Sequence, residues 1–300
     1  MIASSMRSRA VQKQDWLAEK FEENRGRLRA VAYRMLGSLG EADDAVQEAW
    51  LRLSRSRTDE IENLGGWLTT VVSRVCLDIL RSKKLRREES IEPRQHDLIS
   101  SKTNDPEAEA ALADSVGLAL MVVLDRLSPA ERLSFVLHDV FGVSFEEIGG
   151  ILGKSTMATR QLASRARKRI HGKPITSAIN PEHREMTARF LEALRAHDVE
   201  RIVAVLDPQF VIHIDEYSRG SDGPSEVRGA ENWARQAVRF AGGARFTRMA
   251  LVDGDVALLF APYGRLQRVL KLTFANGKIS AAEVIGDRRR MEKMELAVID

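Results

Sequence analysis

Cysteine is almost missing from this chain of 300 residues, since Cys76 is the only one. A single cysteine excludes an internal disulfide and a cysteine-rich zinc site, and it fits a reducing compartment. Long apolar runs are missing too: the run at 117–124, GLALMVVL, is too short to span a membrane, and no signal-peptide core follows the basic N-terminal residues. We therefore expect a cytoplasmic protein with no membrane contact, metal or cofactor.

Acidic residues are absent from the segment Gly153 to Lys173, which has seven Lys or Arg residues. The net charge of the chain is only +3, so attraction to an anionic polymer must come from local clusters such as this one. A solvated basic helix face is the plainer alternative. The residues that precede the segment favour a DNA recognition helix.

Those preceding residues mark helix boundaries with polar caps. Ser128 with Glu131 and Ser144 with Glu147 form two capping boxes, and Pro129 occupies the first helical position after Ser128. Apolar residues between the boxes recur at the three- and four-residue steps of one buried helix face: Leu133, Val136, Leu137, Val140 and Phe141.

A short helix at about 145–152 is expected next, followed by a tight turn at Gly153 and a cap at Ser155. Three apolar residues would anchor the last helix: Met157, Leu162 and Ile170. This order predicts a helix-turn-helix. The start of its second helix would meet base edges through Thr156, Ala158, Thr159, Arg160 and Gln161, and the later Arg165, Arg167, Lys168 and Arg169 would mostly bind phosphates.

Two polar stretches divide the chain into three predicted blocks. A helical domain at 15–87 is followed by a linker at 88–110, and the helix-turn-helix domain at 111–171 by a linker at 172–182. The third block, 183–295, begins with a helix and continues with strand-like runs. They are FVIHID, RFTRMALVD, DVALLFAPY, RVLKLTF and KISAAEVIG, with a hairpin turn at Asn276-Gly277. The fold class is thus multidomain, with two all-α domains followed by an α+β domain.

The first block contains an acidic helix, GSLGEADDAVQEAWLRLSR. Its predicted buried stripe is Ala42, Val46, Ala49, Trp50 and Leu53. Another face combines Asp44, Gln47 and Glu48 with the apolar Leu51. A solvated acidic face would explain the charges, whereas Leu51 among them favours a docking surface for a protein.

The next helix begins at Asn63, places Trp67 early and ends in basic residues. Trp67 is either a core residue or a contact for exposed bases, and the sequence leaves both open. In the second case the basic residues would hold the nucleic-acid backbone: Arg74, Arg81, Lys83, Lys84, Arg86 and Arg87.

In three segments the chain resembles the extracytoplasmic-function (ECF) sigma factors of bacterial RNA polymerase. They are YRMLGSLGEADDAVQEAWLRL, GGWLTTVVSRVCLDILRSKK and the stretch from LSPAERLSFV to ASRARKRI, in this order. The resemblance covers about 15–171.

The resemblance implies a function for each helix. Core polymerase would be bound at its β′ clamp helices by Asp43, Asp44, Gln47, Glu48 and Leu51, and also at its β flap. Melted minus-10 DNA would be held by Asn63, Trp67, Arg74, Arg81, Lys83 and Lys84. Double-stranded minus-35 DNA would be bound by Lys154, Ser155, Thr156, Thr159, Arg160, Gln161, Ser164, Arg165 and Lys168.

The third block resembles a SnoaL-like domain, the cone-shaped fold shared with nuclear transport factor 2, from the stretch NPEHREMTARFLEALRAHDVERIVAVLDPQFVIHID. The resemblance implies the subgroup of ECF sigma factors with this fused domain, which would control the sigma domains by intramolecular contact. The chain departs from that subgroup in the linker SIEPRQHD, in the loop with Asp222, Gly223, Pro224 and Arg228, and in the C-terminal GDRRRMEKMEL.

Alternatives remain for the third block and for the whole chain. His213, Asp215 and Asp255 are polar candidates for a pocket in the cone, which would serve acid-base catalysis or ligand sensing. We expect no enzyme, and a purely intramolecular regulatory surface is the other alternative. The whole chain could also be a ligand-responsive helix-turn-helix regulator with no polymerase role, but this leaves the acidic helix and the Trp67 helix unexplained.

Overall fold

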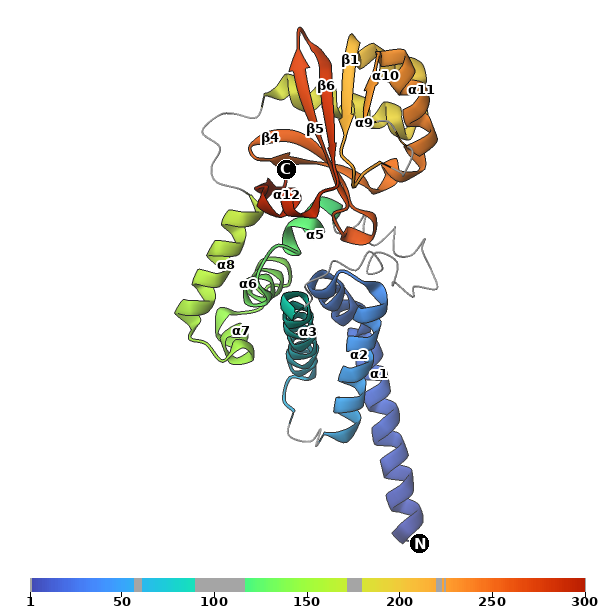
Figure 1. Ribbon diagram of the computed structural model, residues 1–300. Coiled ribbons are helices and arrows are strands. Elements are labelled where there is room, and N and C mark those ends of the chain that lie inside the picture. The colour runs from blue at the N-terminus through green and yellow to red at the C-terminus, as the bar shows by residue number, and fades with distance from the viewer. Residues whose placement is uncertain are drawn as a thin grey trace. The chain divides into compact units, whose positions relative to one another are not determined.

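The computed structural model describes residues 2–56, 61–89, 117–171, 180–219, 223 and 225–299. The chain forms two compact units, and each consists of two segments of the sequence (Figure 1). The first unit comprises Met1–Glu109 and Leu127–Ala166, and the second comprises Ala110–Arg126 and Arg167–Asp300. Most of both predicted linkers, 90–110 and 172–179, lies outside the described residues.

The first unit is helical. Its elements are α1 (Ile2–Leu36), α2 (Leu39–Arg55), α3 (Leu64–Glu89), α6 (Pro129–Phe135), the π-helix η3 (Val136–Val140), α7 (Phe145–Leu152) and α8 (Thr156–Ile170), whose last turn belongs to the second unit. Among the described helices, none combines the length and the apolar character that crossing a bilayer requires.

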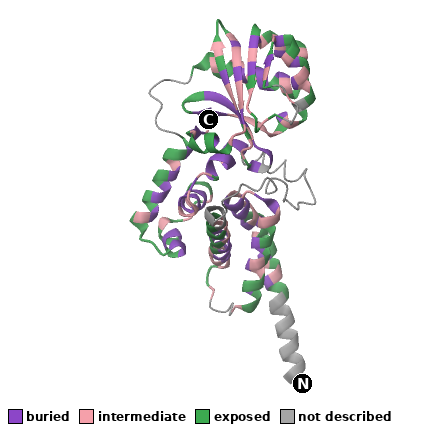
Figure 2. Ribbon diagram, viewed as in Figure 1, coloured by how far each residue is buried: buried purple, intermediate pink, exposed green. Residues whose placement is uncertain are grey.

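Three of these helices, α1, α2 and α3, pack around a shared core. The Ser38 hydroxyl accepts a hydrogen bond from the Glu41 amide and so starts α2, because the first amides of a helix lack partners within it. Tyr33 and Leu68 are completely buried, and the rings of Phe21 and Trp50 lie 5.1 Å apart. Figure 2 shows both buried and exposed residues along the helices of this unit. The predicted helical first block is thus a three-helix domain with an exposed outer face.

The helices α6, η3 and α7 pack against α1 and α3 within the same unit. Arg132 of α6 is 2% exposed, and its Nε donates to the carbonyl oxygen of Arg34 at 2.9 Å. Arg34 in turn lies over the Phe141 ring, 5.4 Å from its centre. The predicted first block and the core of the helix-turn-helix therefore share one packed interior.

The second unit is an α+β domain, as the sequence predicts. Its elements are α5 (Leu118–Leu124), α9 (Pro181–Arg195), α10 (Val199–Val205), β1 (Leu206–Ile214), β2 (Glu226–Arg228), α11 (Ala230–Phe240), the 3₁₀-helix η4 (Ala241–Phe246), β3 (Thr247–Val252), β4 (Asp255–Phe260), the 3₁₀-helix η5 (Pro262–Gly264), β5 (Arg268–Ala275), β6 (Lys278–Ile285), α12 (Arg288–Lys293) and β7 (Leu296–Ala297).

One seven-stranded sheet runs through this unit in the order β2-β1-β6-β5-β4-β3-β7. Only β1 and β6 are parallel, and the other neighbours are antiparallel. The helices α9, α10 and α11 pack on the sheet (Figure 1). Phe190, Phe210 and Ile212 belong to the buried core of this domain. Asn276 and Gly277 both have positive φ, 51° and 68°, which confirms the predicted tight hairpin between β5 and β6.

The five predicted strand runs are confirmed as β1, β3, β4, β5 and β6. The helix α5 lies in sequence within the predicted helix-turn-helix domain, and it packs within the second unit. It packs against β3, η5 and β7, because these elements cover its apolar side chains.

Candidate nucleic-acid interface

Both predicted capping boxes are formed. Ser128 accepts from the Glu131 amide at 3.3 Å, and the Glu131 carboxylate accepts from the Ser128 amide at 3.1 Å. Ser144 and Glu147 repeat this exchange at 3.2 and 3.1 Å. The helix α7 ends at Gly153 with φ of 64°, so the predicted order of helix, turn and helix is confirmed.

The contact between α7 and α8 depends on a glycine and a buried threonine. A Cβ atom at Gly149 would lie 2.7 Å from the Lys154 carbonyl oxygen, so the turn can approach α7 only where no side chain intervenes. Thr159 is fully buried beside Gly149, and its Oγ1 donates to the Ser155 carbonyl at 3.0 Å. Predicted as a minus-35 contact, Thr159 is instead a packing residue, and this part of the site prediction is wrong.

Two predicted core positions are also wrong. Val140 is 38% exposed, because the π-helix η3 inserts an extra residue into the turn and rotates the following side chains away from the interior. Met157 is 72% exposed. The buried stripe of α8 runs through Thr159, Leu162, Ala163, Ala166 and Ile170, and Met157 does not lie on it.

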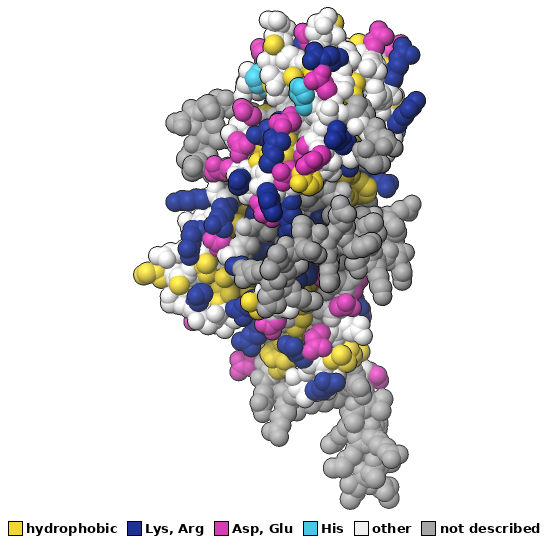
Figure 3. Space-filling model, in the orientation of Figure 1, with side chains coloured by type: hydrophobic (Ala, Val, Ile, Leu, Met, Phe, Trp, Pro, Cys, Tyr) yellow, Lys and Arg dark blue, Asp and Glu magenta, His cyan; other side chains and the backbone are white. Residues whose placement is uncertain are grey.

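The other predicted minus-35 residues are exposed: Lys154, Ser155, Thr156, Arg160, Gln161, Ser164, Arg165 and Lys168. The Ser155 hydroxyl also caps α8, since it accepts from the Ala158 amide at 3.2 Å. Figure 3 shows Lys and Arg side chains gathered along the edge where α8 lies. The helix thus presents a basic surface suited to the phosphates and base edges of DNA.

Two arginines of this surface have contacts within the unit. The Arg160 guanidinium lies over the Phe145 ring, 5.6 Å from its centre, and the other neighbour of that ring is His138, stacked at 3.7 Å. The Arg165 Nε lies 3.9 Å from the Glu131 carboxylate. Both contacts tie the α8 surface to the preceding helices.

The predicted polymerase-binding residues lie on the outer face of α2. Asp44, Gln47 and Leu51 are exposed, Leu51 to 38%. Asp43 pairs with Arg29 at 2.7 Å, and Glu48 pairs with Arg52 one helical turn later at 2.9 Å. The opposite stripe is buried as predicted at Ala42, Val46, Ala49 and Leu53, and half-buried at Trp50.

The predicted minus-10 residues on α3 separate into three groups. Asn63 caps the helix by accepting from the Gly66 amide at 3.0 Å, and Trp67 is half-buried. Arg74, Arg81 and Lys84 are exposed. Lys83, however, is held by the Glu41 carboxylate of α2 at 2.6 Å, which fastens α3 to α2. The side chains of Arg86 and Arg87 lie outside the described residues.

Two of the three pocket candidates of the second unit, His213 and Asp255, are exposed, and the third, Asp215, is half-buried. His213 is exposed on β1, where its Nδ1 lies 3.4 Å from the Glu226 carboxylate. Asp255 begins β4, which is three strands away from β1 in the sheet, or roughly 14 Å at the usual strand spacing. Asp255 is therefore a hairpin residue at the surface.

Asp215 stabilises a backbone turn. Its Oδ2 accepts from the amides of Gly286 and Asp287 at 2.7 and 2.8 Å and so fixes the turn before α12. Burial disfavours the Asp215 carboxylate, but the hydrogen bonds it accepts outweigh burial and lower its pKa below the ordinary value. A carboxyl group that stays ionised in a backbone turn is a poor acid-base catalyst near neutral pH.

Comparison with known proteins identifies the two helical regions. The family profile of Sigma-70 region 2 matches residues 21–86, and that of Sigma-70 region 4 matches residues 117–170. The ECF RNA polymerase sigma factor SigJ of Mycobacterium tuberculosis is 37% identical over 281 residues, which cover 87% of this chain and 89% of SigJ. The chain belongs to the ECF RNA polymerase sigma factors.

Two further similarities extend along most of this sigma factor. The probable ECF sigma factor SigI of Mycobacterium tuberculosis is 35% identical over 280 residues, 90% of this chain and 93% of SigI. The crystal structure of Mycobacterium tuberculosis SigJ aligns with a TM-score of 0.42 and 30% identity, over 91% of this chain and 98% of that structure. The region 2 profile covers α1 from Phe21 onward, α2 and most of α3, and the region 4 profile covers the span from α5 to α8.

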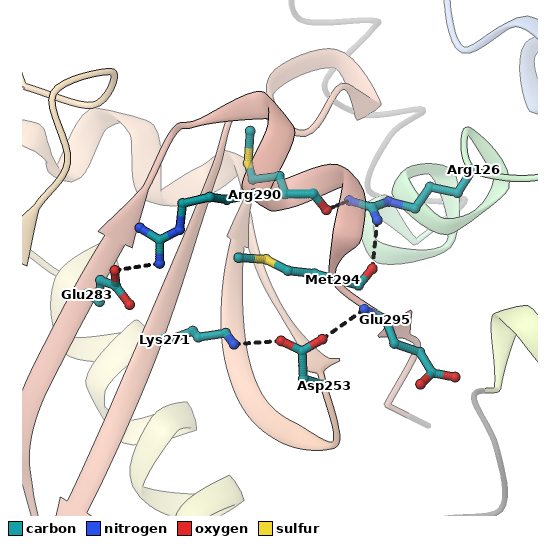
Figure 4. A network of polar contacts seen from close by, with 8 residues as sticks. Arg126, Asp253, Lys271, Glu283, Arg290, Met294 and Glu295 are labelled. Atoms are coloured by element: carbon teal, nitrogen blue, oxygen red, sulfur yellow. Dashed lines mark hydrogen bonds and ion pairs between the residues drawn. The ribbon is translucent and has the colours of Figure 1, made fainter.

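Two arginines of this sigma factor were missed by sequence reasoning. Arg126 and Arg132 both lie in the apolar stretch VVLDRLSPAERLSFVL, where each is the kind of residue that needs a specific partner when buried. The structure supplies backbone carbonyls as partners for both, and Figure 4 shows those of Arg126. The sequence signal that could have revealed these two contacts is a basic residue on each side of the Ser128 capping box, within an otherwise apolar stretch.

Proposed function

We propose that this ECF sigma factor divides its contacts between helices of opposite charge. The outer face of α2 binds the β′ clamp helices of core RNA polymerase, α3 holds the melted minus-10 element, and α8 lies in the minus-35 major groove. The chain acts in the bacterial cytoplasm as a transcription initiation factor without a reaction of its own.

The observation that supports this proposal most is the exposed face of α2. Asp44, Gln47 and Leu51 project from it, and the flanking carboxylates Asp43 and Glu48 are held by local arginines. An apolar side chain surrounded by fixed charges is typical of a protein-binding surface rather than of a purely solvated face. Region 4 contributes the complementary basic surface for DNA.

The α3 surface supports a minus-10 contact through Arg74, Arg81 and Lys84, with Trp67 half-buried among them. Its charges suit the phosphates of a single strand, and the Trp67 ring offers a stacking face. Lys83 contributes to this surface only when it leaves the carboxylate of Glu41.

The alternative of a regulator without a polymerase role has little support. A helix-turn-helix regulator would need the basic surface of α8, but it would not need an exposed face on α2 that combines carboxylates with Leu51. We also propose that the second unit controls the sigma regions through intramolecular contact, since its polar pocket candidates lie apart.

A core polymerase pull-down with matched variants tests the docking face. We expect Asp44→Lys combined with Leu51→Ala to weaken core binding at least about tenfold, because the variant loses an apolar contact and reverses a charge at the centre of the surface. Glu19→Lys, with the same charge change on the exposed face of α1, is the matched control and should bind like the unmodified chain. Both variants should melt normally, since exposed substitutions change stability by about 0.5 kcal/mol or less. Equal core affinity of the double variant and the control would refute the assignment.

A further inference from the structure

Met157 is an apolar side chain at the start of α8 that the structure leaves in solvent. It is 72% exposed, more than any other large apolar side chain in the part of the chain that the structure describes. A single exposed apolar residue needs no explanation on an ordinary surface. Met157 differs because the start of a recognition helix is the part that meets base edges.

Met157 begins the exposed stripe of α8. Steps of four, three and four residues lead from it to Gln161, Ser164 and Lys168, so the four side chains share one face of the helix. All four are exposed, whereas Leu162 on the opposite side is buried. Met157 therefore projects in the same direction as polar residues that we propose to contact DNA.

The backbone around Met157 is held in place by contacts within the first unit. The Lys154 amide donates to the Gly149 carbonyl oxygen of α7 at 2.9 Å, which ties the turn to that helix. Thr159 is fully buried, and its amide donates to the Ser155 carbonyl oxygen at 3.0 Å. The first turn of α8 is thus already ordered, and binding would restrict only the rotamers of the Met157 side chain.

The major groove offers one kind of apolar group to such a side chain. The base edges there present hydrogen-bond donors and acceptors, and thymine alone adds a 5-methyl group. The thioether chain of methionine is unbranched, flexible and polarisable, so it can adjust to the position of a methyl group. A contact between the two removes apolar surface of both from water.

We infer that Met157 is a specificity-determining residue, whose side chain packs on the 5-methyl group of a thymine in the minus-35 element. The inference rests on the proposed function of α8 and adds an apolar contact to the polar ones. Arg160 lies three residues later, which is a rise of about 4.5 Å along the helix. Successive base pairs are about 3.4 Å apart, so the thymine lies within about two base pairs of the pair that Arg160 contacts.

Replacement of thymine by deoxyuridine tests this contact, because it removes the methyl group and keeps every hydrogen-bonding group of the base. Holoenzyme formed from the full chain and core polymerase first selects a preferred sequence from promoter duplexes whose minus-35 element is randomised. Each thymine of the selected element, on either strand, is then replaced singly by deoxyuridine. We expect one position at which the replacement lowers affinity about three- to fivefold, which is the effect of one buried carbon.

Met157→Gln keeps the length of the side chain and a high helix propensity, and it replaces the thioether by an amide. At the sensitive position this variant should bind the thymine and deoxyuridine promoters equally well, because no apolar contact remains to be lost. Met157→Leu stays apolar and should retain most of the preference for thymine. Val140→Ala is the matched control: it shortens another exposed apolar side chain of the same unit, outside α8, and should keep the full methyl effect.

Two results would overturn the inference: equal affinity for thymine and deoxyuridine at every position in the unmodified chain, or a methyl effect that persists in Met157→Gln. Should Met157→Gln fail to fold, Met157→Ala takes its place with the same expectation. Failure of the proposed function is distinct, since the unmodified chain would then select no preferred minus-35 sequence and both ideas would fall. If Met157 alone is wrongly assigned, a preferred sequence appears and its thymines tolerate the loss of the methyl group.

Discussion

The side chain of Arg160 on α8 is oriented by two aromatic rings. Its guanidinium lies over Phe145, and Phe145 is stacked on His138. A planar cation over an aromatic face loses less freedom when it binds a base, because its rotamer is already selected. Phe145 is thus a positioning residue for the base contact that we propose for Arg160.

A binding assay with a set of minus-35 sequences checks this role. Arg160→Ala should cost about 1–3 kcal/mol and relax the preference at one base pair, whereas Lys168→Ala should weaken all sequences alike. Phe145→Leu should relax preference at the same base pair by about 0.5–1 kcal/mol, and Phe145→Tyr should retain it. In an Arg160→Ala background Phe145→Leu should have no further effect on preference. A shift at a different base pair would contradict the positioning role.

Charge and spacing in the sequence predicted that most of these residues are exposed, and this prediction failed where a polar side chain forms its hydrogen bond within its own helix. Thr159 looked like a contact residue because it is polar and near the start of α8. Its hydroxyl donates to the Ser155 carbonyl oxygen one turn earlier, so burial of Thr159 leaves no hydroxyl without a hydrogen bond. Periodicity could not reveal the π-helix that exposes Val140.

Elements were predictable where they are long and regular. The five long strands and α9 follow alternating or helical patterns, but α12 and β7 are too short for any pattern to emerge. The run of α5 is apolar on all sides, so the sequence indicated that it is buried without indicating by which part of the chain. Its partner is set by tertiary contacts with β3, η5 and β7.

The contacts that attach β7 to the sheet should weaken as the pH falls. The Asp253 carboxylate accepts from the Glu295 amide, directly before β7, at 2.9 Å and from Lys271 Nζ at 2.6 Å (Figure 4). Partial burial opposes the charge of Asp253, but Lys271 and the Glu295 amide outweigh it and lower the pKa. A carboxyl group with a lowered folded-state pKa stabilises the fold fully above its unfolded pKa of about 4, and the contribution is lost as the pH falls through the folded value. We expect exchange in 295–298 to accelerate as the pH falls below about 4, after correction for intrinsic rates.

Asp253→Asn should remove most of this pH dependence and show faster exchange of 295–298 already at pH 6. Asp255→Asn, an exposed residue of the same hairpin, should keep it. An unchanged acid response in Asp253→Asn would show that another carboxylate fastens β7.

At the scale of the whole molecule, regions 2 and 4 must separate for the proposed promoter contacts. The minus-10 and minus-35 elements are about 25 base pairs apart, roughly 85 Å along the duplex. In the first unit α3 and α6 are in contact. The buried Arg132 of α6 also donates to the carbonyl oxygen of Arg34, which belongs to α1. The domain boundaries expected from the sequence did not reveal this shared interior, because apolar periodicity does not identify the partner of a helix.

Energy transfer between two labels should detect the separation. We expect Arg132→Ala to lower transfer between labels at Asp78→Cys on α3 and Glu146→Cys on α7, since the Arg34 carbonyl loses its partner at a cost of about 1–3 kcal/mol. Labels at Asp78→Cys on α3 and Glu19→Cys on α1, two helices that pack together, should give the same transfer in both proteins. Burial raises the pKa of the Cys76 thiol to about 12, so the native cysteine should not be labelled. Unchanged transfer between α3 and α7 would show that Arg132 does not hold the regions together.

The contact between α5 and β7, two elements far apart in the sequence, has a consequence for synthesis. Leu296 of β7 is made 172 residues after Leu124 of α5, a delay of roughly 10 to 30 s at ribosomal rates of about 5–20 residues per second. During that time α5 has left the ribosome before its cover exists. In a nascent chain α5 can therefore meet other apolar surfaces before β7 covers it.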